Sequence, residues 1–118
     1  MPIKVYGYKK CGTCRKAEKY LEAVGIDYNF IDITVDPPAK TALKKMISQS
    51  GKGIEKFYNT SGIKYKELDI KTKRKELNEA EQIELLASNG YLLKRPIVTD
   101  GSQTTVAFIE DEFKENWK

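Results

Sequence analysis

Two cysteines three positions apart, Cys11 and Cys14, stand where a predicted strand gives way to a predicted helix. The segment VYGYKKCGTCRKAEKYLE, residues 5–22, starts with β-prone residues and continues with apolar residues at helical spacing. Cys11 falls in the polar loop before the helix, and Cys14 falls one turn inside it on the apolar side. Any fold for this chain must therefore place one sulfur at a helix N-terminus and the other on the inner face of that helix.

Three consecutive elements predict a βαβ unit at the start of the chain. Strands are expected over residues 3–8 and 28–33, and a helix over residues 13–24 that Gly25 ends. The apolar face of this helix is formed by Cys14, Ala17, Leu21 and Val24. A strand, a helix and a strand within about thirty residues are typical of two parallel strands joined by a crossover helix.

The middle of the chain, about residues 37–90, is predicted to be helical. Asp36 is expected to cap a helix opened by the pair Pro37–Pro38. Asn78 and Glu81 have the spacing of a capping box, which favours another helix start at that point.

The last part of the chain changes from helical to strand spacing. Short strands are expected over residues 97–99 and 104–108 around the turn Asp100–Gly101, followed by a helix over residues 110–117. The βαβ half and this ββα half together form a four-stranded mixed sheet, the plan of a thioredoxin-like α/β fold. The sequence therefore predicts a single domain over residues 1–118, with the helical block inserted between the two halves.

The chain contains no histidine, which removes much of the usual side-chain chemistry. Cys-His pairs, Ser-His-Asp triads and imidazole metal ligands are all excluded. A structural zinc site needs four ligands, usually Cys or His, so two cysteines cannot complete one within a single chain. We therefore expect no metal site, unless it is shared between chains or borrows carboxylates.

The net charge of +4 is distributed over interleaved charges of both signs. The run KTKRK, residues 71–75, favours a solvated surface over nucleic-acid binding, because no aromatic residues are interleaved with it. No apolar segment reaches membrane-spanning length, and the first residues lack the features of a secretory signal. We therefore expect a cytoplasmic protein without membrane or direct nucleic-acid contacts, in a compartment where thiols are kept reduced.

The positions of the two sulfurs favour a redox pair over two inert core residues. Free cysteine is often buried, which suits Cys14 but not Cys11 in its polar loop. A helix N-terminus and nearby basic side chains stabilise a thiolate at Cys11; these side chains are Lys9, Lys10, Arg15 and Lys16. Gly12 would let a substrate approach the backbone, and Cys14 could resolve a mixed disulfide on Cys11.

The segment Lys94–Ile97, KRPI, precedes the third predicted strand. In the thioredoxin plan a cis-proline stands here beside the nucleophilic cysteine, so Pro96 is expected to be cis. The alternative is a proline that simply starts a strand without donating an N–H. Arg95 could hold an anion or stabilise the thiolate, and alone it could equally be a surface charge.

Three segments together resemble the ArsC/Spx family of arsenate-reductase-like proteins: CGTCRKAEKYLE, FYNTSG and LLKRPIVTDG. The resemblance spans almost the whole chain and is nearest to short, uncharacterised ArsC-related bacterial proteins. It implies a thioredoxin-like fold with an inserted helical block. It also implies a small thiol–disulfide oxidoreductase whose Cys11–Cys14 pair is reduced by glutathione with glutaredoxin, or by thioredoxin.

Two other activities occur in that family. Its arsenate reductases use a cysteine at the position of Cys11 and several arginines that grip the oxyanion. Arg95 matches one of these arginines, whereas Asn59 stands where another is expected. Its Spx-like regulators use the C-x-x-C pair as a redox switch and bind the C-terminal domain of the RNA polymerase α subunit through a glycine that would align with Gly53. Both activities are alternatives to the reductase.

The expected site therefore has a catalytic pair, residues that orient the substrate, and no bound cofactor. Cys11 is the expected nucleophile and Cys14 the expected resolving thiol. An anionic group such as a glutathione carboxylate would be oriented by Arg95 and by the backbone of Gly12, Thr13 and Arg15, with Pro96 nearby.

Overall fold

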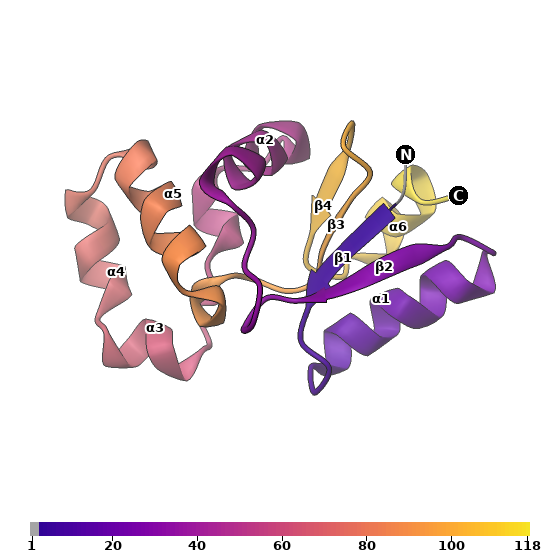
Figure 1. Cartoon of the computed structure of the whole chain (residues 1–118), viewed down its shortest axis with the longest axis horizontal. Coiled ribbons are helices and arrows are strands. Elements are labelled where there is room, and N and C mark those ends of the chain that lie inside the picture. Colours follow the sequence, from indigo (N-terminus) through magenta and orange to yellow (C-terminus); the bar gives the residue numbers. More distant parts are fainter. Residues whose placement is uncertain (1–2) are drawn as a thin grey trace.

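A computed structural model describes residues 3–118, and its centre is a four-stranded sheet (Figure 1). β1 (Ile3–Gly7) pairs in parallel with β2 (Tyr28–Asp32) and antiparallel with β3 (Ile97–Thr99). β4 (Thr104–Val106) pairs antiparallel with β3, giving the order β2-β1-β3-β4. This mixed sheet, with a βαβ half and a ββα half, confirms the predicted thioredoxin-like α/β fold.

Helices α1 (Gly12–Ala23) and α6 (Glu110–Asn116) pack on one face of the sheet. Their apolar side chains form one buried cluster with the strands, consisting of Val5, Ala17, Leu21, Val98, Phe113 and Trp117. The indole N–H of Trp117 donates to Thr105 Oγ1 at 3.0 Å, so its polar atom is satisfied inside the core. Burying a side chain of this size stabilises the fold by about 2 kcal/mol.

The helical block that joins β2 to β3 packs on the opposite face of the sheet mainly through its first helix, and its later helices extend away from the sheet (Figure 1). This block consists of α2 (Lys40–Ser50), η1 (Ile54–Phe57), α3 (Ile63–Glu67), α4 (Ile70–Lys73), η2 (Arg74–Glu76), α5 (Glu79–Ser88) and η3 (Gly90–Leu92). Tyr6 faces this block while its neighbour Val5 faces α1, because side chains alternate along a strand. The core is therefore divided between the two faces of β1.

Two backbone hydrogen bonds tie the loop before α3 to the segment before β3. Asn59 N donates to Leu92 O at 2.8 Å, and Lys94 N donates to Phe57 O at 2.8 Å. Gly90 approaches the sheet so closely that a Cβ there would collide with the backbone carbonyl of Ile33. These contacts hold the helical block next to the end of the sheet where the C-terminus of β1 lies.

Most predicted elements are found, and the differences have local causes. The capping box of Asn78 and Glu81 is present with both of its hydrogen bonds. Asp36 does not cap α2, which begins at Lys40 after an extended Ala39. Residues that precede a proline are pushed away from helical conformation, so Asp36 and Pro37 stay outside the helix.

Two other predicted boundaries are wrong. Val24 was expected on the buried face of its helix, but it follows α1 as the C-cap and is 41% exposed. The second hairpin strand was expected to reach Phe108, but it stops at Val106 because Ala107 has a positive φ of 67°.

Candidate active site

Cys11 lies at the N-cap of α1, after a three-residue loop that follows the end of β1. Its backbone is extended, with φ −87° and ψ 121°, and the helix starts at Gly12, one residue earlier than predicted. Its N–H donates to Tyr8 O at 3.0 Å, which closes the short loop between strand and helix. The half-exposed sulfur of Cys11 therefore sits where the first N–H groups of the helix have no partner within the helix.

Hydrogen bonds and charge lower the pKa of the Cys11 thiol below its ordinary 9.0. Burial is the largest single effect and acts to raise this pKa, but the effects that lower it are larger in sum, beginning with hydrogen bonds from the Cys14 thiol and the Thr13 hydroxyl. The Cys14 backbone N–H and the positive charge of Arg95 act in the same direction. The Thr13 Oγ1 atom lies 3.0 Å from the Cys11 sulfur. Each of these groups favours the thiolate, which is the nucleophilic form of cysteine.

Cys14 has the opposite environment, although it lies only one helical turn away. Its side chain is fully buried, and both cysteines are free thiols in this structure. Burial, together with the hydrogen bond and the negative charge of Cys11, raises the pKa of Cys14 to about 12. The pair thus combines an accessible thiol whose pKa is lowered with an enclosed thiol whose pKa is raised.

Gly7, the last residue of β1, is in close contact with Cys14. A Cβ at Gly7 would lie 2.8 Å from the Cys14 sulfur and 3.3 Å from the Phe30 ring. Glycine is therefore the residue that lets the first turn of α1 approach the strand. Sequence reasoning missed Gly7, although a glycine inside a strand pattern is itself a signal of close backbone approach.

Arg95 lies close enough to the thiol pair for its charge to act on Cys11, and its guanidinium group also contacts the ring of Tyr8. The Arg95 guanidinium carbon is 5.6 Å from the centre of the Tyr8 ring, within the range of a cation–π contact. The Arg95–Pro96 peptide bond is cis, as the fold plan predicted. Nothing in the sequence pointed to Tyr8, because the contact joins residues from distant parts of the chain.

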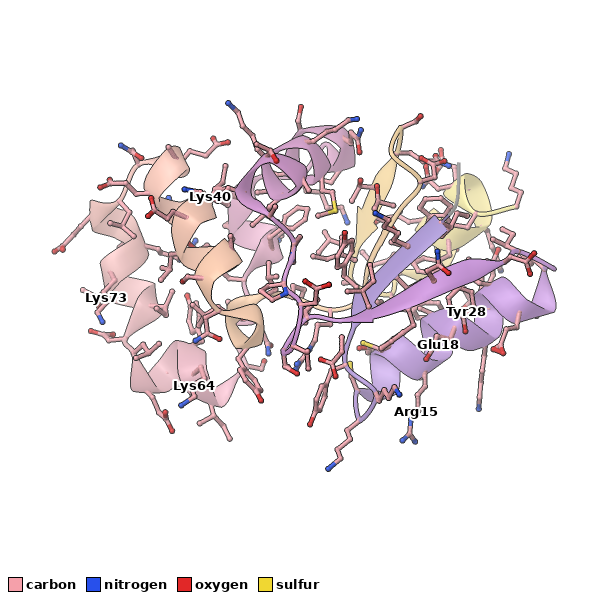
Figure 2. The ribbon with its side chains drawn as sticks, viewed as in Figure 1. Arg15, Glu18, Tyr28, Lys40, Lys64 and Lys73 are labelled. Atoms are coloured by element: carbon pink, nitrogen blue, oxygen red, sulfur yellow. The ribbon has the colours of Figure 1, made fainter. Side chains whose placement is uncertain are left out.

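The other predicted substrate-orienting residues lie at the start of α1. Arg15 is exposed, and its Nε donates to the Lys9 carbonyl at 3.2 Å, which ties the helix to the preceding loop (Figure 2). Gly12 has open space where a Cβ would be, so the backbone there is accessible. Thr13 contacts Cys11 directly through its side chain rather than only through its backbone.

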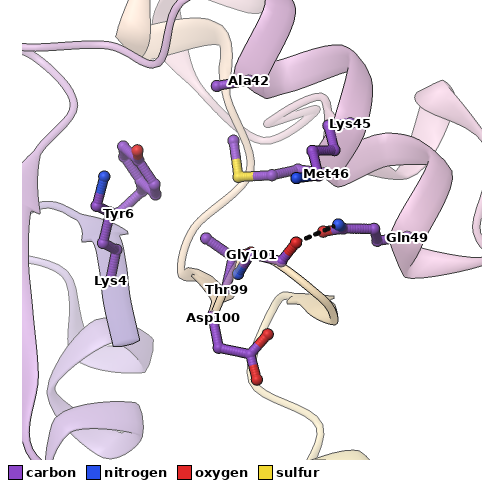
Figure 3. Close-up of a pocket in the computed structure, with 9 residues that line it drawn as sticks. All are labelled: Lys4, Tyr6, Ala42, Lys45, Met46, Gln49, Thr99, Asp100 and Gly101. Carbon is purple, nitrogen blue, oxygen red and sulfur yellow. Dashed lines mark hydrogen bonds between the residues drawn. The ribbon is translucent and has the colours of Figure 1, made fainter. Parts of the chain in front are cut away.

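A cavity lies between α2 and the start of β1, at the opposite end of this strand from the thiol pair (Figure 3). It has a volume of about 230 Å³, and Lys4, Tyr6 and Met46 contribute to its lining. Gln49 already donates to Gly101 O at 2.7 Å across its rim. Lys4 lies near the start of β1, where it pairs with Thr99, whereas Cys11 lies beyond the other end of the same strand. This cavity is therefore separate from the thiol site.

Within residues 3–118, the structure has neither a cluster of metal-binding side chains nor a helix suited to span a membrane. No group of three or more Cys, Asp or Glu side chains in this part of the chain is arranged to hold a metal ion. Over the same residues, no helix combines the length and apolar character needed to cross a membrane.

Comparison with known proteins identifies the family of the chain. The ArsC family model matches residues 6–116, which include both cysteines and Arg95. The chain belongs to the ArsC family. The relative YusI of Bacillus subtilis, an uncharacterised protein, is 53% identical, with 99% of each chain covered. The global transcriptional regulator Spx of Streptococcus pyogenes is 32% identical over 88% of this chain and 76% of its own.

Among solved structures, an ArsC family related protein from Bacteroides fragilis superposes with a TM-score of 0.92. It is 41% identical in sequence, and the match covers 98% of this chain and 97% of the other. The ArsC-family fold predicted from the three sequence segments is therefore confirmed over nearly the whole length.

We predict that Thr13→Val will raise the pKa of Cys11 in this ArsC-family protein, because it removes a hydrogen bond that favours the thiolate. The rate of Cys11 alkylation by iodoacetamide, followed against pH by mass spectrometry, should have a midpoint below 9.0 in the natural chain. In the variant the midpoint should move to higher pH, and the rate at pH 7 should fall several-fold. Thr41→Val, at an exposed position of α2, is the matched control and should leave the profile unchanged. An unmoved midpoint in Thr13→Val would contradict this assignment.

We predict that the cost of Gly7→Ala depends on the sulfur of Cys14. The added methyl group should destabilise the fold by about 1–3 kcal/mol, which is typical of overpacking. In a Cys14→Ala background the same change should cost clearly less, because the atom at 2.8 Å is gone. Urea unfolding of the four proteins in this double-mutant cycle gives the coupling. Additive costs would mean that Gly7 has another role.

Proposed function

We propose that this ArsC-family chain is a thiol–disulfide reductase, with Cys11 as the nucleophile and Cys14 as the resolving thiol. The observation that carries the proposal is the placement of Cys11 at the accessible N-cap of α1 and of Cys14 fully buried one turn later, which shifts the two thiol pKa values in opposite directions. An attacking thiol must be ionised and accessible. A resolving thiol must lie close to it and stay protonated, and so unreactive, until a mixed disulfide forms.

The reaction begins with the Cys11 thiolate attacking one sulfur of a disulfide R–S–S–R′. A Cys11–S–S–R bond forms, the S–S bond of the substrate breaks, and R′–S⁻ leaves. The Cys14 sulfur then attacks Cys11, which forms the Cys11–Cys14 disulfide and releases R–S⁻. The proton of Cys14 ends on R′–S⁻, so the two electrons gained by the substrate come from the two cysteines.

The second step becomes easier once the first has occurred. The thiolate of Cys11 contributes to the high pKa of Cys14 both as a hydrogen-bond partner and as a negative charge. Both contributions disappear when Cys11 enters a mixed disulfide. The pKa of Cys14 then falls, although burial still keeps it raised. This coupling would keep Cys14 inactive until its attack is needed.

The cycle closes when an external thiol reduces the Cys11–Cys14 disulfide. Two molecules of glutathione, acting directly or through glutaredoxin, would supply the two electrons, and a thioredoxin dithiol would serve equally. Arg95 supports this step, because its charge lies beside the thiol pair and could orient a carboxylate of the incoming thiol.

A redox-switched regulator is the second candidate, and similarity to Spx supports it. Here the Cys11–Cys14 disulfide would alter binding to the C-terminal domain of the RNA polymerase α subunit near Gly53. Arsenate reduction has less support, since Arg95 is accompanied by Asn59 rather than by a second arginine. Turnover with a disulfide, turnover with arsenate and binding to the α-subunit domain distinguish the three activities.

We predict that the two cysteines give different defects when they are replaced separately. Cys11→Ser should abolish disulfide reduction, because the attacking thiolate is gone. Cys14→Ser should still form the first adduct but should be unable to resolve it, so a mixed disulfide should accumulate and be seen by intact-protein mass spectrometry. Full reductase activity in Cys11→Ser would overturn the mechanism. A variant with both serines should form no adduct and serves as the control.

A further inference from the structure

A groove of about 600 Å³ begins beside the thiol site and runs along the start of α3. Tyr8 and Arg95 form its end nearest the cysteines, and Asn59, Ile63, Lys64 and Tyr91 are among its other lining residues. These residues come from distant parts of the chain. The backbone hydrogen bond from Asn59 to Leu92 brings the loop before α3 and the segment around Tyr91 together.

Exposed apolar side chains from two elements meet in this groove. Ile63, at the start of α3, is 74% exposed, and Tyr91, in η3, is 46% exposed. Single exposed apolar residues are ordinary on a protein surface. Two that line one groove, next to a reactive thiol, form an apolar surface that a bound molecule could cover.

The charges in the groove have one sign. Lys64 and Arg95 line it, and no carboxylate is among the lining residues within the described part of the chain. Lys64 pairs with Glu67 at 3.3 Å, but both side chains are about half exposed. Such a surface pair is weak, so Lys64 can exchange it for a carboxylate on a bound molecule (Figure 2).

We propose that this groove binds a polypeptide segment that carries the disulfide to be reduced. An apolar side chain of the segment would cover Ile63 and Tyr91, and an acidic side chain would lie near Lys64 and Arg95. This inference rests on the proposed reductase function and names its substrate class as proteins. Glutathione has carboxylates for the two cations but no apolar side chain for the exposed pair, so it would leave half of the groove unused.

The test compares three probes that release the same coloured thiol. Each is a mixed disulfide with thionitrobenzoate: a peptide with Leu and Asp near its cysteine, the same peptide with Ser and Lys instead, and glutathione. The reduced protein supplies the electrons, and absorbance gives the second-order rate constant of thionitrobenzoate release. The natural chain should react at least about ten-fold faster with the Leu/Asp peptide than with either other probe, since an apolar contact and a charge contact would both be made.

Two variants with matched controls locate the preference on the groove. Ile63→Ser should lower the ratio of the Leu/Asp peptide rate to the glutathione rate about five-fold or more. Lys64→Glu should lower the ratio of the Leu/Asp peptide rate to the Ser/Lys peptide rate. The controls are Val35→Ser, at an apolar position that is 82% exposed, and Lys73→Glu, at an exposed position of α4, neither of which lines the groove. Both controls should leave the ratios unchanged.

The possible outcomes separate the groove from the chemistry. Equal rates with all three probes, or ratios that do not respond to Ile63→Ser and Lys64→Glu, would overturn the groove while leaving the reductase intact. Faster reaction with glutathione than with the Leu/Asp peptide would also overturn it and would assign the site to small thiols. No release from any probe would overturn the reductase itself, and with it the groove.

Discussion

The thiol site depends on how closely the start of α1 can approach the end of β1. Because Gly7 has no Cβ, the sulfur of Cys14 fits against the strand instead of being pushed outward. The rest of α1 is fixed to the same sheet face by Ala17 and Leu21, which are fully buried. The result is a helix N-terminus held directly beyond the strand, with Cys11 at its tip and Cys14 enclosed behind it.

This placement is enough to give two identical side chains opposite acid–base behaviour. Cys11 is half exposed and accepts hydrogen bonds, so its charged form is stabilised. Cys14 is enclosed and faces the negative charge of Cys11, so its neutral form is stabilised. Neither histidine nor metal is needed for this separation, which accounts for a chain that can support thiol chemistry without any histidine. In the proposed reductase, this electrostatic asymmetry across one helical turn would take the place of a separate general base.

Local sequence patterns were sufficient for the elements and for the thiol pair, and insufficient for what surrounds the pair. The strand–helix–strand pattern and the C-x-x-C spacing predicted where Cys11 and Cys14 lie, because both depend on neighbours along the chain. The contact of Gly7 with Cys14 and that of Tyr8 with Arg95 depend on distances in space. They follow from strand pairing and helix packing, which local patterns specify only in outline.

The wrong helix start has a local cause, whereas the groove depends on residues that are distant in the sequence. Asp36 has the chemistry of a helix cap, but the two prolines after it hold the chain extended, and that backbone restriction outweighed the capping preference. The groove needs Asn59 and Tyr91 to be brought together across about thirty residues of helical block, so no single segment of the sequence reveals it.

The reduction potential of the Cys11–Cys14 couple tests the central claim most directly. The protein would be equilibrated in graded glutathione buffers and quenched with acid, and the disulfide fraction would be read by mass spectrometry. The account predicts one reversible transition to an intrachain disulfide, on the order of −120 to −270 mV, where working dithiol couples lie. If no intrachain disulfide forms, or if only a glutathione adduct appears on Cys11, then Cys14 is a core residue and the two-thiol account is wrong.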